Sequence, residues 1–332
     1  MIGAEQYREA MDVMRGWDRV WIVAHAHADG DAIGSLIGAR AGLRTVARDV
    51  TAFVFEPITR RYEFLVADDP LQVWNDESAK ATRPDGLVLV DTCSRSQIEP
   101  FHPVLDSLSA PIVVFDHHKT RDIEAAVGLF DESAASTSLL IAEWAEANEI
   151  AFDKATNLAL FAGLSSDTGW FRYENADRRA FETAGRMIEH GVHPDELYRR
   201  LYCTDRPQRL AMLARIFDTL ELHADGRVAT AYYTQEMMKK SGAKSGDLEE
   251  LVSEIGRIGS IVTWALFSEQ EDGRVRVNLR SKDTVDVAAL AARLGGGGHA
   301  RAAGARMNGS IEDARVQIVR ELTAALGEHT DP

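Results

Sequence analysis

Carboxylates and imidazoles follow apolar segments in the first half of the chain. The run 20–24 (Val-Trp-Ile-Val-Ala) leads directly to His25, and Asp29 and Asp31 follow within a short stretch that contains a glycine. Imidazole and carboxylate side chains together are common ligands of divalent metal ions. A solvated turn with two surface aspartates would explain this stretch equally well, so taken alone it does not decide between the two.

The same arrangement recurs further along the chain. It is seen at three more points: 86–90 before Asp91, 111–115 before Asp116-His117-His118, and 161–166 before Asp167. In an open parallel sheet, ligands bind beyond the carboxyl ends of the strands. We therefore expect these side chains to meet at one edge of a sheet. One metal site explains the set better than four unrelated surface turns.

Together with a glycine run near the C-terminus, these residues resemble the motifs of a known superfamily. His25-x-x-x-Asp29-x-Asp31, Asp91, Asp116-His117-His118 and Asp167 resemble the four motifs of the DHH phosphoesterases, and 295–304 (Gly-Gly-Gly-Gly-His-Ala-Arg-Ala-Ala-Gly) resembles the signature of the associated DHHA1 domain. The pair is similar to the NrnA-type group of oligoribonucleases and pAp phosphatases. One departure is Ala28, where many relatives carry proline, and it leaves the ligand set untouched.

The resemblance implies a site for two metal ions. His25, Asp29 and Asp91 are expected to bind one ion, and the other is assigned to Asp31, Asp91, His117 and Asp167, with Asp91 bridging the two. The donor types favour Mn²⁺, with Mg²⁺ and Co²⁺ as competitors, because they are mostly oxygens with two imidazoles and no thiolate. Six ligands are too many for one catalytic ion with open positions, and they suit two ions about 3.5–4 Å apart.

Four further residues near this site are candidates for supporting roles. Asp116 is expected to orient an imidazole, and His118 to donate to the phosphate or to the leaving oxygen, unless it packs beneath the site. Arg172 is a candidate phosphate contact, with a surface ion pair as the alternative. Ser136, before an apolar run, is typical of a helix N-cap, and that helix N-terminus could also face the anion site.

The glycine run in the second half is expected to contact the substrate. Successive glycines let backbone N–H groups approach an anion or a base closely, although a merely flexible loop is the alternative. The run lacks the Lys-Ser/Thr ending of a P-loop, which excludes that motif. The candidate substrate-binding residues in this half are Arg280, Ser281, Lys282, Gly296, Gly297, Gly298 and His299.

The elements that would position these residues indicate an α/β protein of two domains. Strands alternating with helices predict a largely parallel sheet in residues 1–185, the DHH domain that the resemblance implies. Residues 186–222 contain two helical patterns with no strand between them, which predicts a helical linker. A smaller α/β domain, DHHA1 by resemblance, is expected in 223–332, with strands at 226–233, 260–269 and 274–279 and a closing helix at 311–326.

Composition narrows the class of substrate. The net charge is −15, and the chain lacks the overall basic footprint that long nucleic acids require. No apolar run is long enough to span a membrane, and the stretch from Met1 to Met14 does not resemble a secretory signal. Only two cysteines are present, Cys93 and Cys203, which is typical of a reducing cytoplasm.

These observations favour a Mn²⁺-dependent phosphodiesterase and phosphatase acting on short nucleotides. The expected substrates are oligoribonucleotides of about two to five units, pAp, and linear or cyclic dinucleotides, with long duplexes and membranes excluded as partners. A homodimer is left open. A RecJ-like single-strand exonuclease should be longer, and a family II pyrophosphatase or exopolyphosphatase should lack the glycine-histidine signature. A non-catalytic nucleotide-binding regulator is the alternative from another class, and the intact ligand set argues against it.

Overall fold

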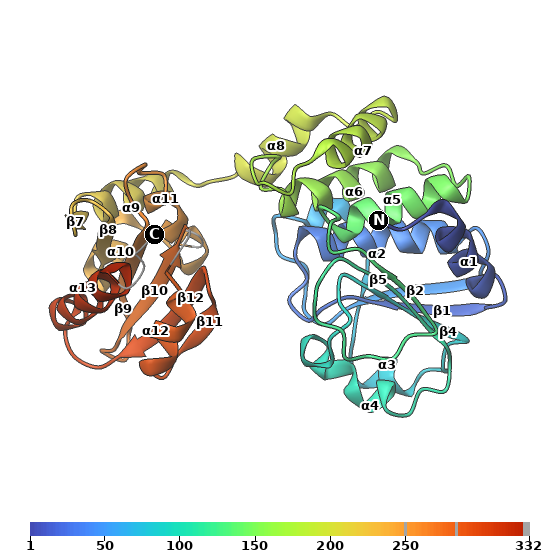
Figure 1. Ribbon diagram of the computed structural model, residues 1–332, viewed down its shortest axis with the longest axis horizontal. Coiled ribbons are helices and arrows are strands. Elements are labelled where there is room, and N and C mark those ends of the chain that lie inside the picture. The colour runs from blue at the N-terminus through green and yellow to red at the C-terminus, as the bar shows by residue number, and fades with distance from the viewer. Residues whose placement is uncertain (249–250, 283–284, 328–332) are drawn as a thin grey trace. The chain divides into compact units, whose positions relative to one another are not determined.

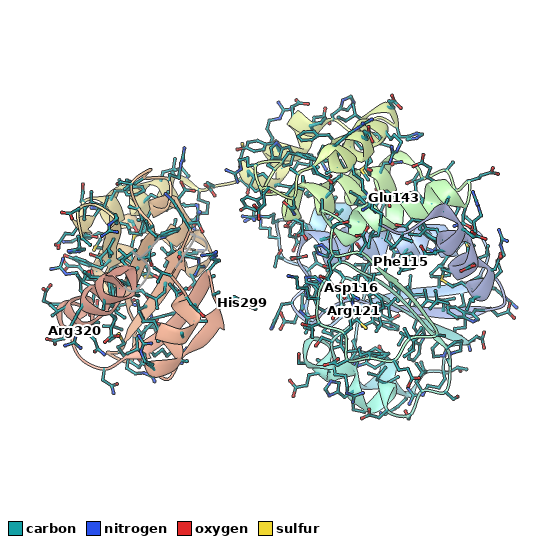
Figure 2. All side chains as sticks on the ribbon, in the orientation of Figure 1. Phe115, Asp116, Arg121, Glu143, His299 and Arg320 are labelled. Carbon is teal, nitrogen blue, oxygen red and sulfur yellow. The ribbon has the colours of Figure 1, made fainter. Side chains whose placement is uncertain are left out.

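A computed structural model describes residues 1–248, 251–282 and 285–327 (Figure 1). The chain forms two compact units, Met1–Cys203 and Thr204–Pro332, each with its own hydrophobic core. Figure 2 labels Asp116 in the first unit and His299 in the second. No helix in these described ranges is long and apolar enough to cross a membrane.

The first unit is built on a six-stranded sheet in which every pairing is parallel, as the sequence predicts. The strands are β1 (Arg19–Val23), β2 (Asp49–Val54), β3 (Gln72–Val73), β4 (Gly86–Val90), β5 (Ile112–Asp116) and β6 (Val127–Phe130). Their order is β3-β2-β1-β4-β5-β6, so the chain reverses its direction of travel across the sheet between β1 and β4. Such a switch point leaves a crevice at the carboxyl ends of the two strands, where ligands bind in open α/β sheets.

Helices cover both faces of this sheet (Figure 1). They are α1 (Ala4–Met14), α2 (Gly30–Leu43), α3 (Asp76–Lys80), α4 (His102–Leu105), α5 (Thr137–Ala147), α6 (Lys154–Asp167), α7 (Arg178–Glu189) and α8 (Pro194–Tyr202). The main core lies between the sheet and α1, α2, α5 and α6, and a second cluster that includes Trp21, Leu89 and Phe101 covers the other face.

Close packing of α2 against α6 matters for the site. A Cβ at Gly34 would lie 2.5 Å from the carbonyl oxygen of Ala159, and one at Gly38 would lie 2.7 Å from Leu160. Only glycine permits this separation of the two helices. Because α2 begins at Gly30 and α6 ends at Asp167, the contact holds the start of one helix beside the end of the other.

The second unit contains a six-stranded mixed sheet of order β11-β12-β10-β9-β8-β7. Its strands are β7 (Glu221–His223), β8 (Val228–Tyr233), β9 (Thr263–Glu269), β10 (Val275–Ser281), β11 (Gly297–His299) and β12 (Ala302–Met307). Helices α12 (Val287–Arg293) and α13 (Ile311–Gly327) pack on one face. The other face carries α9 (Pro207–Phe217), α10 (Gln235–Ser241) and α11 (Leu251–Ile255).

The stretch 186–222, where the sequence suggests a linker, is divided between the two units. Leu197 and Leu201 of α8 belong to the core of the first unit, whereas Met212 and Ile216 of α9 belong to a core cluster of the second. Helices α8 and α9 are amphipathic, and each packs its apolar side chains into the core of the unit to which it belongs. The chain passes from one compact unit to the other between Cys203 and Thr204.

The glycine run is partly a strand rather than the merely flexible loop that the sequence leaves as an alternative. Gly297–His299 pairs antiparallel with β12, so the run forms one side of a hairpin. A Cβ at Gly296 would lie 2.1 Å from the carbonyl oxygen of Gly304, and Gly298 has a φ of +143°, which other residues rarely adopt. At least these two glycines are therefore needed for the hairpin itself.

Candidate metal centre

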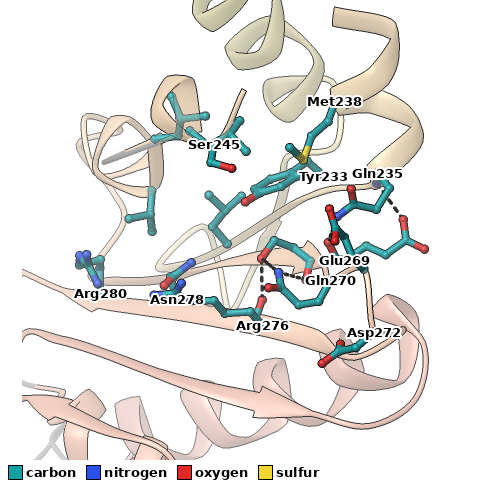
Figure 3. A pocket seen from close by; sticks show the side chains of 16 residues that line it. Tyr233, Gln235, Met238, Ser245, Glu269, Gln270, Asp272, Arg276, Asn278 and Arg280 are labelled. Atoms are coloured by element: carbon teal, nitrogen blue, oxygen red, sulfur yellow. Dashed lines mark hydrogen bonds between the residues drawn. The ribbon is translucent and has the colours of Figure 1, made fainter. Parts of the chain in front are cut away.

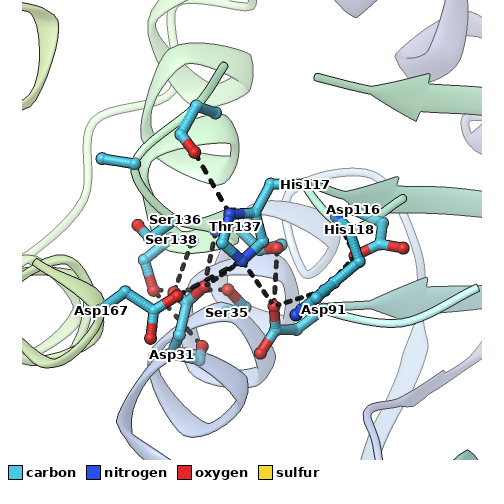
Figure 4. Close-up of polar contacts among 12 residues, drawn as sticks. Asp31, Ser35, Asp91, Asp116, His117, His118, Ser136, Thr137, Ser138 and Asp167 are labelled. Carbon is cyan, nitrogen blue, oxygen red and sulfur yellow. Dashed lines mark hydrogen bonds and ion pairs between the residues drawn. The ribbon is translucent and has the colours of Figure 1, made fainter. Parts of the chain in front are cut away.

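The predicted ligands of the first unit meet at the carboxyl edge of its sheet, and Figure 4 shows four of them, Asp31, Asp91, His117 and Asp167. His25 follows β1, Asp91 follows β4 and His117 follows β5, which are three adjacent strands. Asp31 lies in the first turn of α2 and Asp167 ends α6, so the close contact of these helices brings both carboxylates to the same edge. The sheet and one helix pair thus assemble the site.

Two groups of donor atoms converge at this edge. His25 Nε2 lies 3.8 Å from Asp29 Oδ1 and 3.4 Å from Asp91 Oδ2. His117 Nε2 lies 3.3 Å from Asp167 Oδ2, 3.6 Å from Asp91 Oδ1 and 4.0 Å from Asp31 Oδ2. Donor atoms that share an ion at about 2.1 Å are themselves about 3–4 Å apart. Both groups therefore have the spacing of a metal site.

His117 shows that a cation fits here. Its Nδ1 lies 3.2 Å from the carbonyl oxygen of Ala134, to which it can only donate, and this leaves Nε2 as a lone-pair donor in the neutral ring. Nε2 is buried and has no hydrogen-bond partner in the described structure, yet it faces the carboxylates of Asp31, Asp91 and Asp167. A lone pair aimed at negative charge requires a positive charge between them, either a proton or a metal ion.

The same crowding shifts the pKa values of the site. Burial, followed by the charges of Asp91 and Asp167, raises the pKa of Asp31 well above its usual range. Burial opposes the charged form of His25, but the nearby carboxylates of Asp29 and Asp91 outweigh it and raise the pKa of His25 to about 10. The pKa of His117 is raised to about 10 in the same way, with Asp167 as the nearest carboxylate. The free site therefore holds protons at neutral pH.

These shifts predict that metal binding releases protons. An imidazole with a pKa of about 10 is protonated at pH 7, and it must lose that proton before it can bind a metal ion. Affinity for Mn²⁺ should therefore increase with pH from 6 to 9, by up to about tenfold per unit for each displaced proton. Titration calorimetry in buffers of different ionisation enthalpy measures both quantities. A pH-independent affinity would contradict this account of the site.

Asp116 and His118 form a pair beside the two groups. The His118 ring lies 2.8 Å from Asp116 Oδ1 through its Nδ1, and its backbone N–H donates to the same oxygen at 3.1 Å. This hydrogen bond raises the pKa of His118. Asp116 is fully buried, whereas the His118 side chain is 44% exposed, which excludes the alternative that His118 packs beneath the site. The pair can present a proton donor at the surface of the site.

Helix α5 contributes contacts that sequence reasoning missed. Ser136 caps the helix as predicted, with its Oγ accepting from the N–H of Leu139 at 3.1 Å. The next two N–H groups, of Thr137 and Ser138, donate to Asp31 at 2.6 and 2.8 Å, and Thr137 Oγ1 donates to Asp91 Oδ1 at 2.9 Å. This N-terminus therefore binds a carboxylate of the protein. The run Ser-Thr-Ser at a helix start was the available signal.

Arg172 lies outside these two groups of donors. It is exposed, and its Nε donates to the carbonyl oxygen of Gly169 at 2.6 Å. The residues Gly169, Trp170 and Phe171, between Asp167 and Arg172, all have positive φ values, so the chain makes a left-handed turn directly after α6. The turn and the hydrogen bond to Gly169 therefore fix the position of Arg172, five residues after Asp167.

In the second unit, the strand pairing places Arg280 and His299 on one face of the sheet. Arg280 pairs with Ala302, and Ala302 pairs with His299, so the three form a row across β10, β12 and β11. Asn278, Gly304 and Gly297 form the neighbouring row. Ala302 and Gly304 of β12 are small, so no bulky side chain lies between Arg280 or Asn278 on one side and His299 on the other.

Arg280 and Asn278 also line a cavity of ≈ 610 Å³ (Figure 3). Tyr233 at the end of β8 and Met238 of α10 line the same cavity. Ser281 is buried and follows Arg280 in the strand, so it faces the opposite side of the sheet. The Lys282 Nζ donates to the carbonyl oxygen of Ile258 at 2.7 Å. Of the three predicted residues 280–282, Arg280 is the one that faces the cavity.

Comparison with known proteins supports this description. Residues 19–164 match the N-terminal domain of the DHH family, and residues 225–328 match the DHHA1 domain. The chain is 28% identical to a probable bifunctional oligoribonuclease and PAP phosphatase NrnA of Streptococcus mutans, over 90% of this chain and 93% of that one. It is 29% identical to the bifunctional oligoribonuclease and PAP phosphatase NrnA of Bacillus subtilis, over 94% and 96%.

A solved structure has the same fold. The crystal structure of an exopolyphosphatase-related protein from Bacteroides fragilis aligns with a TM-score of 0.87, over 98% of this chain and 99% of that one. At 21% sequence identity this likeness concerns the fold alone. The metal-ligand pattern, the two family matches and the two relatives agree with the resemblance first seen in the motifs. The chain therefore contains a DHH N-terminal domain followed by a DHHA1 domain.

Proposed function

We propose that this protein is a two-metal phosphoesterase that hydrolyses short nucleotides to mononucleotides. The observation that carries the proposal is the pair of donor groups at the carboxyl edge of the first sheet, with one oxygen of Asp91 facing each group. The two relatives named NrnA support a hydrolase acting on oligoribonucleotides and on pAp. Linear and cyclic dinucleotides belong to the same chemical class, because their nucleosides are joined by the same phosphodiester bond.

The donor groups divide naturally between two ions. We assign His25, Asp29 and Asp91 to one ion and Asp31, Asp91, His117 and Asp167 to the other. When bound, two such ions would activate water as the nucleophile and offset the charge of the phosphate. The chain's own contribution is to fix the donor positions and to keep the imidazole Nε2 atoms directed at the ions.

We assign His118 to proton transfer. It is the exposed member of the Asp116–His118 pair, and the buried carboxylate holds its ring and favours its protonated form, since it raises the pKa of His118. A protonated imidazole at this edge can donate to a phosphate oxygen or to the leaving oxygen. Asp116 acts through His118 and fixes the orientation of its ring.

Mn²⁺ is the ion that these donors favour, with Mg²⁺ and Co²⁺ as competitors. The site offers four carboxylates and two imidazoles, a mixture that suits Mn²⁺ better than the oxygen-only ligands that Mg²⁺ prefers. No thiolate belongs to the donor groups: Cys93, two residues after Asp91, is buried, and its Sγ donates to the carbonyl oxygen of Ile123. Element analysis of the purified protein, with activity after reconstitution by each ion, tests this assignment.

We propose that the second unit contributes substrate-binding residues. Arg280, His299 and the backbone of Gly296–Gly298 lie on or beside one sheet face, where a guanidinium can bind a phosphate and an imidazole can contact a base. Arg172 is a further candidate contact in the first unit. Ser281 is buried and Lys282 donates to the backbone of Ile258, and neither residue lines the cavity that Arg280 lines.

The charge of the chain and its cysteines bear on its partners and location. A net charge of −15 disfavours long nucleic acids as substrates. Both cysteines are free, one buried and one exposed, which supports a reducing, cytoplasmic location.

We propose residues 1–185 as the catalytic part and 223–332 as the substrate-binding part of the chain.

One assay panel tests the proposed function. Initial rates are measured on pAp, pApA, cyclic di-AMP, a five-nucleotide RNA and a long RNA of about 24 nucleotides, with Mn²⁺ and with EDTA. We expect Mn²⁺-dependent turnover of the short substrates. Binding without turnover would identify a non-catalytic regulator, and preference for the long RNA would identify a RecJ-like exonuclease.

Replacement of His299 by alanine tests the role of the second unit. We expect KM to increase by about tenfold, because a binding contact is lost from the substrate complex. Mn²⁺ affinity should stay unchanged, because His299 belongs to a different compact unit from the metal donors. Steady-state kinetics on pApA and calorimetric Mn²⁺ titration measure the two effects. Arg320→Ala, on α13, is the control. Lost Mn²⁺ affinity with unchanged KM would make His299 a metal ligand.

A further inference from the structure

A short segment that runs from the end of β6 into the first turn of α5 contacts the donors of one proposed ion site. This support segment, residues 131–138, reaches two of them through α5, since the N–H groups of Thr137 and Ser138 bind Asp31 and the Thr137 hydroxyl binds Asp91. The carbonyl oxygen of Ala134 accepts the hydrogen bond that fixes the tautomer of His117. These three donors all belong to the site that we assign to Asp31, Asp91, His117 and Asp167.

The fourth donor is joined to the segment by Asn175. The Nδ2 of Asn175 donates to the carbonyl oxygen of Ala135 at 3.2 Å and to the backbone carbonyl oxygen of Asp167 at 3.1 Å. One amide group therefore bridges the support segment and the last turn of α6. Every donor of this site is connected to residues 131–138, directly or through one side chain.

The other site is held by different parts of the chain. Asp29 Oδ1 accepts from the backbone N–H groups of Asp31 and Ala32 at the start of α2. His25 Nε2 faces Asp29 Oδ1 and Asp91 Oδ2. The shared ligand Asp91 is divided in the same way, because Thr137 binds Oδ1, which faces His117, whereas Oδ2 faces His25.

The support segment is itself fixed by buried charges. Asp131 accepts from the backbone N–H and the Oγ of Ser133 at 3.0 and 2.6 Å, and from Arg179 at 2.7 Å. Arg179 also makes two hydrogen bonds to Glu143 of α5, at 2.5 and 2.6 Å. This ion network ties the first residue of the segment to the helix that follows it, so the backbone groups facing the site have little freedom to move.

We propose that Thr137 is a positioning residue for one metal ion only, and that the two ion sites can therefore be weakened separately. The inference rests on the two-metal function proposed above. Removal of the Thr137 hydroxyl frees Asp91 Oδ1 while the contacts near Asp91 Oδ2 stay in place. Loss of a group that orients a metal ligand typically lowers metal affinity by about 10- to 100-fold.

Mn²⁺ titration of the full-length protein tests this proposal. In wild type we expect two bound ions by calorimetry and by electron paramagnetic resonance. In Thr137→Val, which keeps the side-chain shape, one dissociation constant should increase by about tenfold or more while the other stays within about threefold. Thr137→Ser keeps the hydroxyl and should bind both ions nearly as wild type does. Thr183→Val replaces another buried threonine, on α7, and should leave both ions unchanged.

A second variant acts on the same site from another position. Asn175→Ala removes the bridge between Ala135 and Asp167 and should weaken the same single ion, which keeps the proposal testable if Thr137→Val fails to fold. Equal weakening of both ions, or equal effects of Val and Ser at position 137, would overturn the positioning role. Absence of two bound ions in wild type would overturn the proposed function as well.

Discussion

Replacing Asp91 with asparagine is expected to lower kcat by at least about a thousandfold, equivalent to about 4 kcal/mol of barrier. Its two carboxylate oxygens face different donor groups, His25 on one side and His117 on the other. An amide keeps one oxygen as a weak ligand and turns the other position into a donor, so neither ion keeps a charged bridging ligand. The measurement is the initial rate on pApA across a range of Mn²⁺ concentrations.

The same variant should fold without metal, which separates its loss of activity from loss of structure. Asp91 has a positive φ, in the left-handed region that asparagine adopts more readily than most residues. The amide oxygen can still accept from the Thr137 hydroxyl. Loss of one negative charge also relieves repulsion on buried Asp31, whose pKa is raised by burial and by Asp91. The variant also loses the attraction of Asp91 for the protonated His25 and His117. Because the two effects oppose each other, Asp91→Asn should unfold in EDTA close to the wild-type temperature.

The control for this experiment is Asp106→Asn, at an exposed carboxylate that pairs with Arg95. It should keep wild-type activity and the increase in unfolding temperature that Mn²⁺ produces in wild type. Asp91→Asn should lose most of that increase. If it retained more than about a tenth of the wild-type rate, the loss would be no more than about 1 kcal/mol, and the bridging assignment would be wrong.

The second large effect concerns substrate length. We expect kcat/KM to fall by about a hundredfold or more between RNAs of two to five nucleotides and one of about 24 nucleotides. The net charge is −15, so each phosphate beyond the proposed contacts with Arg280 and the glycine hairpin should add repulsion. Binding energy stops increasing after a few nucleotides, whereas the repulsion continues to increase with length.

Ionic strength separates this explanation from a purely steric one. Salt screens repulsion between exposed charges, with a Debye length of about 10 Å at 0.1 M and about 3 Å at 1 M. The difference between short and long substrates should therefore narrow as salt increases. The measurement is kcat/KM against length at several salt concentrations. A profile that is flat or rises with length would indicate a processive, RecJ-like enzyme.

The parallel sheet was predictable because its strands are apolar on both faces. Gly86–Val90 and Ile112–Asp116 are almost continuous apolar runs, and each ends where a carboxylate begins. The glycine hairpin was not predictable in the same way. Gly297–His299 has no apolar pattern, and its pairing with β12 depends on a partner strand rather than on its own side chains.

Three candidate ligands, His25, Asp91 and His117, were predictable for a similar reason, since the strand ends that they follow meet at one edge of the parallel sheet. Asp31 and Asp167 reach this edge from α2 and α6 instead. Thr137 was missed because its role depends on two residues far away in sequence, Asp31 and Asp91, which only the tertiary structure brings to α5. The left-handed backbone of Asp91 was also invisible, because aspartate carries no signal for it as strong as glycine would. Tertiary contacts and strained backbone are the parts that a pattern of residue types does not encode.

The spacing of the donors along the chain has a consequence for how the protein is made. The ligands run from His25 in the loop after β1 to Asp167 at the end of α6, and the central contact of α2 with α6 joins the two extremes. A ribosome releases the first of these donors long before the last. The complete centre can therefore form only after α6 has left the exit tunnel and packed against α2, so binding of both proposed ions would follow the synthesis of α6 and could precede that of α7 and α8, which complete the first unit.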